Sequence, residues 1–446
     1  MKPIFKLFYR IYRPASSLWY WARRRFTLPG LCVAGGVVVA GGVGTDIENT
    51  VTYQIFALLL AFLVLSFACS RFFSAKFSAT RSLPRFGTAG QPLHYSVLVK
   101  NLTAQNQKGL TLLEDLDDPR PPFEEWLAVS LAKSRRVRPF RYTGRSSVSF
   151  KLVNLKEAEV PPVSPGGETE VRVELTPLRR GILRFNGVTL ARPDPIGLFR
   201  SFVKISAPQT VLILPKRYWL PPVALPGTMR YQEGGVALAA NIGRSEEFVS
   251  LREYRHGDPM RHIHWRSWAK VGKPIVKEFE DEFFVRHALV LDTFADEPRS
   301  EILEEAVSVA ASFACAVLTQ ESLLDLLFVG PESYCFTAGC GLAHADQMLE
   351  ILASVKNCDD KNFAVLEQLV INHVSVVSGC ICVLQKWDDG RKKLVEKLRA
   401  LDVPVLVLVV AQPGGAKPDA GPLCDAPDCF HVLEIGKIAE QLAGLK

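Results

Sequence analysis

The sequence predicts a multidomain α+β membrane protein: an N-terminal transmembrane helical hairpin, an antiparallel β-sandwich, and a C-terminal α/β domain with a mostly parallel sheet. Three observations support this fold class. Two long uncharged segments lie near the N-terminus, residues 86–220 alternate apolar and polar side chains, and residues 286–446 alternate short apolar runs with helical stretches. At 446 residues the chain is also long enough to form two or three separate cores.

The first two predicted elements are membrane-spanning helices. Residues 28–44 form an uncharged run of 17 residues, at the short end of spanning length, and residues 53–70 form a second run. A cleaved signal peptide is the alternative for the first run, but a 27-residue basic lead and a second apolar run soon after it argue against cleavage. The sequence therefore predicts a basic N-terminal segment at 1–27 and a transmembrane hairpin at 28–73.

The orientation of this hairpin follows from its flanking charges. Lys and Arg lie outside both ends of the hairpin, whereas the connecting turn contains Asp46 and Glu48 and no basic residue. Basic residues near membrane helices are enriched on the cytoplasmic side. We therefore predict a two-pass protein with both termini in the cytoplasm.

The net charge is concentrated near the membrane. The whole chain carries +7, but residues 1–113 contain thirteen Lys or Arg and two acids, so they carry +11 and the remainder carries −4. Basic side chains close to anionic lipid each contribute about 1 kcal/mol of attraction. The soluble body is thus near neutral or slightly acidic, which disfavours nucleic-acid binding because phosphate recognition needs a basic surface.

The ten cysteines follow no disulfide pattern, and several lie in apolar stretches. Cys380 and Cys382 form a C-x-C inside a predicted buried strand, where a period of two places both on one face. Zinc and redox sites use the spacing C-x-x-C, and no second pair accompanies these two residues. We interpret them as buried structural thiols in a reducing compartment, with a metal or redox role as the alternative.

Strand periodicity identifies the sandwich domain at 86–220. Three segments, HYSVLV, SVSFKLV and ETEVRVEL, place apolar residues on one face and more polar residues on the other. The Pro and Gly residues of 161–167 predict a turn between strands. Short alternating strands joined by such turns favour an antiparallel β-sandwich. The Pro- and Arg-rich segment 114–145 has no predicted structure.

Apolar runs and helical stretches alternate in the C-terminal domain, 286–446. The predicted strands are HALVLDTF, LLDLLFVG, GCICVLQKW and VPVLVLVV. The predicted helices are Ser300–Thr319, His344–Lys356, Phe363–His373 and Arg391–Leu401. Strand, helix and strand at this spacing predict a parallel sheet with helices on both faces. Neither G-x-G-x-x-G nor a P-loop Lys follows any of these strands, so nucleotide binding has no support.

Residues 240–285 connect the two soluble halves and fit neither a helix nor a strand throughout. The segment is dense in Arg, acids and aromatic residues, and Gly257, Asp258 and Pro259 predict a turn within it. Its string R-E-Y-x-x-G-D-x-x-R-x-I-x-W, followed by A-K-x-G-K and E-F-E, resembles the family called domain of unknown function 58. The earlier string RPDPIGLFRS resembles the D-P-x-G-L-F element of the same family.

Two sets of residues carry this resemblance. The first set is Arg252, Glu253, Tyr254, Gly257, Asp258, Arg261, Trp265, Arg266, Lys270, Gly272 and Glu278. The second set is Asp194, Pro195, Gly197, Leu198 and Phe199. The chain departs from the family pattern at Trp268, where many members have a smaller residue.

The resemblance implies a fold and a role. Members of the family are membrane-anchored bacterial proteins with a β-rich segment and a C-terminal domain similar to von Willebrand factor A. They are associated with MoxR-type AAA+ ATPases, and no enzymatic activity is established for them. We therefore expect a two-pass protein of the bacterial cytoplasmic membrane that acts as a cytoplasm-facing scaffold or adaptor. The expectation includes neither catalysis nor a cofactor, and it specifies no oligomeric state.

Three roles stay open for the motif segment. It could form a polar network that joins the sandwich to the α/β domain, in which case we expect Asp258, Arg261 and Trp265 to hold this junction. It could instead dock a partner ATPase. The enzyme alternative is a metal-dependent hydrolase that uses the His/Asp-rich motif at 252–266, but the histidines there lack a third ligand at a recognised spacing.

The resemblance to von Willebrand factor A also allows a comparison of metal ligands. In that fold D-x-S-x-S at the end of the first strand holds Mg²⁺, since the ion prefers carboxylate and hydroxyl oxygens. The corresponding residues here begin at Asp292, with Phe294 in place of the first hydroxyl and Asp296 in place of the second. A later carboxylate, Asp388, is displaced along the chain. We therefore predict a degenerate site without metal, in which Lys386 pairs with Asp292 in place of the ion.

Overall fold

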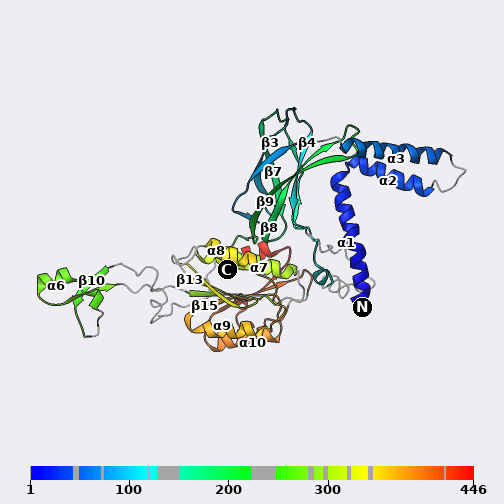
Figure 1. Cartoon of the computed structure of the whole chain (residues 1–446). Helices are drawn as coiled ribbons and strands as arrows, with labels where there is room; N and C mark the ends of the chain where they lie inside the picture. Colours follow the sequence, from blue (N-terminus) through cyan, green and yellow to red (C-terminus); the bar gives the residue numbers. More distant parts are fainter. Residues whose placement is uncertain are drawn as a thin grey trace. The chain divides into compact units, whose positions relative to one another are not determined.

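The computed structural model contains two compact units, residues 1–216 and 217–446 (Figure 1). Helices and antiparallel or mixed sheets occur in it, as the predicted α+β class requires. The described residues are 2–43, 50–71, 75–118, 120–127, 151–221, 248–256, 258, 260–279, 286–294, 300–318, 323–339, 345–415 and 418–445.

The basic N-terminal segment, for which the sequence predicted no secondary structure, forms helix α1, Lys2–Arg25. Near the start of this helix, the ring of Tyr9 packs on that of Trp126, with their centroids 5.4 Å apart. Near its end, Arg24 pairs with Asp115 at 2.6 Å. The helix is thus attached to the rest of the first unit at both ends.

Helices α2, Leu28–Val43, and α3, Thr50–Arg71, lie side by side (Figure 1). Small residues allow this approach, because a methyl group at Gly36 would lie 3.2 Å from the side chain of Leu59. Within the described residues, α3 alone is long and apolar enough to cross a membrane, and α2 is shorter, at 16 residues. The predicted connecting turn at 44–49 lies outside the described residues.

Strands β1–β9 form a β-sandwich of two sheets. One sheet has the order β1-β3-β7-β5 and the other has the order β2-β9-β8-β4-β6. Every pair is antiparallel except β2 with β9, which is parallel. The strands are β1 Phe77–Ser82, β2 Phe86–Thr88, β3 Leu93–Asn101, β4 Leu110–Leu116, β5 Val153–Leu155, β6 Ala158–Val160, β7 Glu168–Pro177, β8 Gly181–Pro193 and β9 Arg200–Leu214.

The core of the sandwich follows the period of its strands. In β3 the side chains of Leu93, Tyr95, Val97 and Val99 are buried in one cluster, while those between them are more exposed. This alternation is the signal that predicted HYSVLV and ETEVRVEL, and both predictions are confirmed by β3 and β7.

Two details of the sandwich differ from the predicted pattern. Strand β1 begins at Phe77 and pairs with β3, so the first sheet starts before the predicted boundary at residue 86. The predicted strand SVSFKLV lies mostly outside the described residues, and the strand that follows it is β5. Part of the segment 114–145 is described: β4 extends through Leu116, and residues 123–127 are helical.

The second unit begins with a small module built from the motif segment. Strands β10, Phe248–Glu253, and β11, Ile275–Phe279, form a two-stranded antiparallel sheet. Between them lie the 3₁₀ turn Met260–His262 and helix α6, Trp265–Val271. We call residues 248–279 the motif module.

The α/β domain has a six-stranded sheet of order β14-β13-β12-β15-β16-β17. Its strands are parallel except for the edge strand β14. The strands are β12 Arg286–Leu291, β13 Leu323–Val329, β14 Ser333–Ala338, β15 Gly379–Leu384, β16 Val405–Ala411 and β17 Phe430–Glu434. The helices are α7 Glu301–Leu318, α8 Ala345–Ser354, α9 Ala364–His373, α10 Asp389–Ala400 and α11 Ile438–Ala443. The four predicted strands and four predicted helices are confirmed, while β14, β17 and α11 were not predicted.

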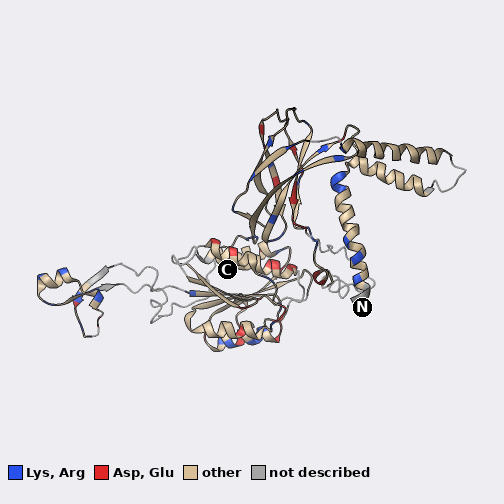
Figure 2. Cartoon of the chain, viewed as in Figure 1, with Lys and Arg blue, Asp and Glu red and all other residues tan. Residues whose placement is uncertain are grey.

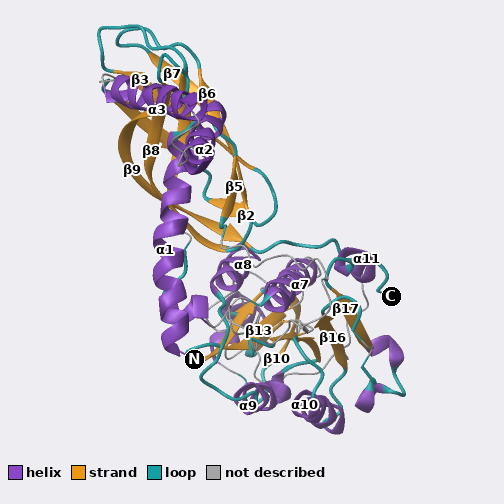
Figure 3. Ribbon diagram, turned by 90° about the vertical axis from the view of Figure 1, so that its right-hand side faces the viewer, coloured by secondary structure: helices purple, strands orange, loops and turns teal. Residues whose placement is uncertain are grey.

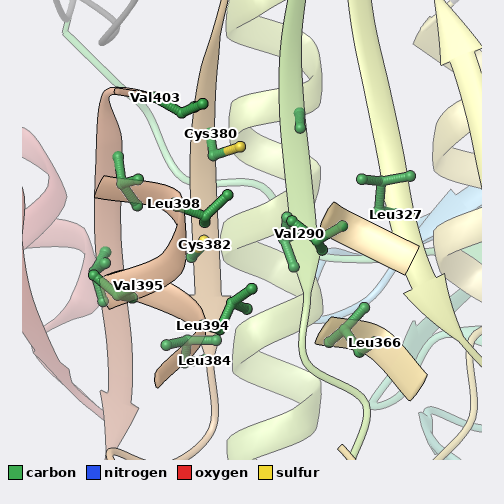
Figure 4. Close-up of a cluster of buried hydrophobic side chains, with 14 of the residues drawn as sticks. Val290, Leu327, Leu366, Cys380, Cys382, Leu384, Leu394, Val395, Leu398 and Val403 are labelled. Carbon is green, nitrogen blue, oxygen red and sulfur yellow. The ribbon is translucent and has the colours of Figure 1, made fainter. Parts of the chain in front are cut away.

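Helices cover both faces of this sheet, with α7 and α8 on one face and α9 and α10 on the other (Figure 3). On the second face, Cys382 and Leu384 of β15 pack with Leu394 and Leu398 of α10 (Figure 4). Cys380 lies in the same cluster, and burial raises the pKa of its thiol to about 12. The prediction of buried structural thiols is therefore confirmed at this C-x-C.

Candidate functional site

Asp292 follows β12 at the carboxyl end of the parallel sheet and is fully buried. Its Oδ1 accepts a hydrogen bond from the backbone N–H of Phe294 at 3.0 Å, and its Oδ2 accepts one from the backbone N–H of Gln385 at 3.1 Å. The side-chain amide of Gln385 donates to the backbone oxygen of Asp292 at 2.7 Å. Because a buried carboxylate is costly without a positive partner, these neutral donors leave a need for a cation.

Arg391 of α10 supplies this positive charge. Its Nε and Nη2 both lie 2.8 Å from Oδ2 of Asp292, and its Nη1 donates to Asp388 at 2.6 Å. Asp388 is the N-cap of α10, so the start of the helix determines where the guanidinium lies. Burial disfavours the guanidinium charge, but Asp292 and Asp388 together hold the pKa of Arg391 above its ordinary value. The prediction that Lys386 would take this place was wrong.

The chain direction explains this correction. Lys386 lies two residues after the end of β15, close to the strand end in sequence, and it lines the cavity beside the pair. The guanidinium of Arg391 instead reaches back from the first turn of α10, where it can bridge two carboxylates that a single ammonium group would contact less well.

An open cavity of about 280 Å³ adjoins the Asp292–Arg391 pair. Its floor is aromatic: the guanidinium carbon of Arg391 lies 4.5 Å from the ring centre of Phe363, and Phe294 packs edge-on to Phe363 at 5.9 Å. Two lysines, Lys361 and Lys386, and one acid, Asp359, line it together with Arg391, whose charge is already paired with Asp292 and Asp388. The lysines give the cavity a small excess of positive charge, which favours an anionic group. The lining residues are Phe294, Cys358, Asp359, Lys361, Asn362, Phe363, Lys386 and Arg391.

The sequence predicted a degenerate metal site at Asp292, with Phe294 and Asp296 in place of two hydroxyl ligands. Phe294 contributes a ring to the cavity in place of a ligand oxygen, and Asp296 lies outside the described residues. Within the described part of the chain, no three His, Cys, Asp or Glu side chains form a group that could hold a metal ion. The positive charge beside Asp292 therefore belongs to a side chain.

The motif module is held by its own ion pair. Arg252 donates two hydrogen bonds to Asp258, at 2.7 and 2.8 Å, and the backbone N–H of Arg255 donates a third at 2.8 Å. The hydrogen bond from Arg252 is the main cause that lowers the pKa of Asp258 to about 2. Arg261 and Trp265 are both exposed within the module, and their role at a domain junction stays a prediction.

Helix α6 presents an aromatic pair to solvent. The indoles of Trp265 and Trp268 stack with centroids 5.2 Å apart, and Trp265 is 63% exposed. Trp268, the departure from the family pattern, thus supports its neighbour within the module. Gly272 ends the helix with φ +72°, a left-handed conformation that favours glycine.

The other predicted motif residues lie in the same module. Glu253 pairs with Lys273 at 3.0 Å on the surface, and the backbone N–H of Tyr254 donates to Pro274. Arg266 and Lys270 are exposed on α6. Gly257 and the side chain of Glu278 lie outside the described part of the module.

The second motif forms the turn between β8 and β9. The buried carboxylate of Asp194 accepts a hydrogen bond from the backbone N–H of Phe199 at 2.8 Å. Pro195 occupies the turn, and Gly197 adopts φ +80°, so the chain reverses within the D-P-x-G-L-F string. Leu198 and Phe199 are both buried.

This turn contacts all three N-terminal helices. The hydroxyl of Ser66 in α3 donates to Asp194 at 2.7 Å, and the backbone N–H of Thr27, before α2, donates to the carbonyl of Leu198 at 3.1 Å. The Phe199 ring packs on Phe26 at 5.0 Å, and also on Trp21 and Phe67. The second motif therefore attaches the N-terminal helices to the sandwich.

Sequence reasoning missed the partners of both sites. Ser66 is a polar residue within an apolar run, which is a weak signal for a buried hydrogen bond. Gly30 contacts the second motif even more closely, because a methyl group there would lie 1.9 Å from the carbonyl oxygen of Leu198. Its proximity to the motif follows only from the folded chain.

These elements define a multidomain α+β protein with one helix suited to crossing a membrane, a β-sandwich, and an α/β domain with a charged pair at its strand ends. Residues 250–410, which include most of the motif module and of the α/β domain, match the family described as "Protein of unknown function DUF58". This match confirms the family resemblance seen in the motif segment.

A curated relative is the "Uncharacterized protein YeaD" of Bacillus subtilis (strain 168), which is 29% identical over 188 residues. The match covers 42% of this chain and 45% of the relative, less than half of either protein. The relative carries no assigned activity in its name, so it transfers none to this chain.

Solved structures match parts of the chain at low TM-scores. The PapD-like domain of human CEP192 gives a TM-score of 0.18 at 9% identity, covering 32% of this chain and 87% of that domain. A CARDB domain from Pyrococcus furiosus gives 0.15 at 12% identity, covering 29% and 94%. Scores of this size indicate nothing about function.

Proposed function

We propose that this chain is a membrane-anchored scaffold or adaptor of a bacterial cytoplasmic membrane, and that it binds a partner protein at the carboxyl end of the sheet in its α/β domain. The observation that carries the proposal is the buried Asp292–Arg391 pair beside a basic cavity. The ends of parallel strands are the usual binding edge of such sheets. An acidic side chain of a partner fits the charge of this edge.

The α/β domain is proposed to be similar to von Willebrand factor A. Its parallel strands, antiparallel edge strand and helices on both faces support the comparison. In a metal-dependent domain of that kind, a partner carboxylate completes the shell of the ion. Here Arg391 takes the place of the ion beside Asp292, and Lys361 and Lys386 of the cavity offer positive charge to such a carboxylate.

The partner class is proposed from the family resemblance to be a MoxR-type AAA+ ATPase. The motif module offers a second surface for such a partner, since Trp265 and Trp268 stack on each other there. Arg266 and Lys270 are exposed on the same helix. Nucleic acid is not proposed as a partner, because the basic excess lies in the first 113 residues.

The anchor is proposed to be a two-pass hairpin of α2 and α3 with both termini in the cytoplasm. The packing of α2 on α3 and the basic residues outside their ends support this topology. Helix α2 is short for a full crossing, at about 24 Å from its 16 residues. Local thinning of the bilayer, or flanking side chains that reach back to the interface, would compensate for the missing length of the helix.

Binding of a purified MoxR-type ATPase to the full chain in lipid nanodiscs tests this proposal. We expect Lys361→Glu with Lys386→Glu to weaken binding at least tenfold, because both cavity cations are reversed. Lys393 is an exposed cation on α10 outside the cavity, so Lys393→Glu is the matched control and should bind as the wild type does.

EDTA should leave the affinity unchanged, whereas 0.5 M salt should lower it because exposed charges are screened. Loss of binding with EDTA, or full binding by the double variant, would contradict the proposal.

The alternative of a metal-dependent hydrolase at 252–266 gains no support from the geometry. Asp258 is occupied by Arg252 and by the backbone of Arg255. His264 hydrogen-bonds through Nδ1 to Ser267 at 2.6 Å. The proposal therefore rests on the α/β domain.

A further inference from the structure

Helix α1 presents a long apolar stripe that no described part of the protein covers. Leu7, Ile11 and Leu18 are 60%, 60% and 65% exposed. Their spacings of four and seven residues place them in one row along the helix. Phe8 and Trp19, also largely exposed, widen this row into a face.

A second face of α1 is basic. Lys6, Arg10 and Arg13 are exposed, and their spacing of four and three residues places them in a row of their own (Figure 2). Residues 1–27 contain seven Lys or Arg and no acid. The helix is therefore amphipathic, with the net positive charge of segments that bind anionic surfaces.

A third face attaches α1 to the protein and leaves the apolar stripe open. The hydroxyl of Tyr9 donates to the carbonyl of Pro121 at 3.0 Å, and its ring packs on Phe123 at 5.3 Å. Tyr12 stacks on Trp126 at 5.8 Å. These contacts fix the rotation of the helix about its axis.

The direction of α1 matches a membrane surface. In two views at right angles, α1 runs across the direction of the α2–α3 pair (Figures 1 and 3). Only Phe26 and Thr27 separate the end of α1 from the start of α2. If α3 crosses the bilayer, the C-terminal end of α1 lies at the membrane boundary and the helix extends along it.

We propose that α1 lies in the interface of an anionic bilayer, with Leu7, Ile11 and Leu18 inserted at the boundary between the headgroups and the acyl chains, and the Lys and Arg face near the headgroups. The occupant of the apolar face is lipid, because the face is continuous with the membrane helices and the adjacent face is basic. Aromatic residues such as Trp19 prefer this depth. The inference rests on the proposed anchoring of the chain by α3.

Spin labels on single cysteines in the otherwise cysteine-free full chain test this inference. The chain is reconstituted in vesicles of phosphatidylcholine with phosphatidylglycerol, or in phosphatidylcholine alone. Labels at Ile11 and Leu18 should be more accessible to oxygen than to a water-soluble nickel chelate, by at least threefold in the anionic vesicles. Labels at Lys6 and Arg13 should show the reverse preference, and K6Q/R10Q should reduce the depth measured at Ile11.

A label at Leu58 in α3 separates the two proposals. If Leu58 reports the bilayer interior while Ile11 and Leu18 report water, the inference about α1 is wrong and the anchor stands. If all three report water, the proposed anchor fails as well. Broadening between labels at Ile11 that depends on protein density would show that a second copy covers the face, and would overturn the lipid assignment.

Discussion

The hydroxyl of Ser66 in α3 donates a 2.7 Å hydrogen bond to the buried carboxylate of Asp194, which lies 128 residues further along the chain. The apolar helix and the D-P-x-G-L-F turn are thus joined by a charged hydrogen bond. The same turn binds the segment before α2 through Thr27 and packs Phe199 on the end of α1. The D-P-x-G-L-F turn thus links the sandwich to all three N-terminal helices.

Ser66→Ala should loosen this link. The variant removes one of the hydrogen bonds to the Asp194 carboxylate, at a cost of about 1.5–3 kcal/mol. Hydrogen exchange of the amides at 194–199 should become faster. Ser70→Ala is the control, because the Ser70 hydroxyl donates to Phe67 in the same helix and should cost little. Equal exchange in wild type and Ser66→Ala would mean that the link is not stabilising.

Gly30→Ala should destabilise the contact between α2 and the turn. The added methyl group would lie 1.9 Å from the Leu198 carbonyl oxygen, so backbone must move, at a cost of about 1–3 kcal/mol. Gly35→Ala in the same helix has open space and should be neutral or up to about 1 kcal/mol more stable. Thermal unfolding of the two variants in one detergent would compare them. A Gly30 variant as stable as the Gly35 variant would argue against this close approach.

Arg391→Met should destabilise the α/β domain by about 3–5 kcal/mol, since it leaves the buried Asp292 charge without a cation. Adding Asp292→Asn should recover part of this loss, because the double variant removes both charges. Arg399→Met, also on α10, breaks an exposed pair with Asp425 and should cost at most about 1 kcal/mol. Resistance to protease in urea would measure all three. Equal losses at positions 391 and 399 would refute the buried pair.

Acid should weaken the motif module over a defined pH range. The folded-state pKa of Asp258 is lowered to about 2, chiefly by its hydrogen bond to Arg252, from an ordinary value of 3.8. The stability that this carboxylate contributes is therefore present above about pH 4 and is lost as pH falls through about 2. Carboxyl ¹³C NMR titration should show a rise toward 3.8 in Arg252→Gln. Lys273→Gln, which breaks the neighbouring surface pair with Glu253, should leave the pKa of Asp258 unchanged.

Cysteine labelling should reveal the membrane topology. In a chain whose native cysteines are replaced by Ala, a reporter cysteine at Val51 should react with an impermeant maleimide in intact cells, because the start of α3 is predicted to face outward. A reporter at Asp419 in the α/β domain should react only after the cells are opened. Labelling of the Asp419 reporter in intact cells would place that domain outside and exclude a cytoplasmic partner.

Local patterns determined much of the fold. The period of two in HYSVLV and the alternation of apolar runs with helical stretches after residue 286 predicted strands and helices at their observed places. These patterns are reliable because burial of one face acts on each element separately. The motif segment pointed to the family that residues 250–410 match, but its string did not say what each residue contacts.

The partners of the charged residues were decided by tertiary structure. Asp292 pairs with Arg391, which is 99 residues away, although the sequence pointed to Lys386. Asp258 pairs with Arg252, one of four Arg residues that the sequence left open as its partner. Arg255 and Arg261 are both closer to Asp258 in the sequence than Arg252 is, so spacing alone would not have selected the observed partner.

The sequence by itself therefore determined the elements, the concentration of basic residues near the membrane, and the family. Only the tertiary structure decided that the first turn of α10 places Arg391 beside Asp292. It also decided that the β8–β9 turn contacts Ser66 and Gly30. The physical reason is the sequence separation over which each kind of interaction acts. Periodicity is a property of consecutive residues, whereas the geometry of an ion pair or a close backbone contact depends on where distant elements start and pack.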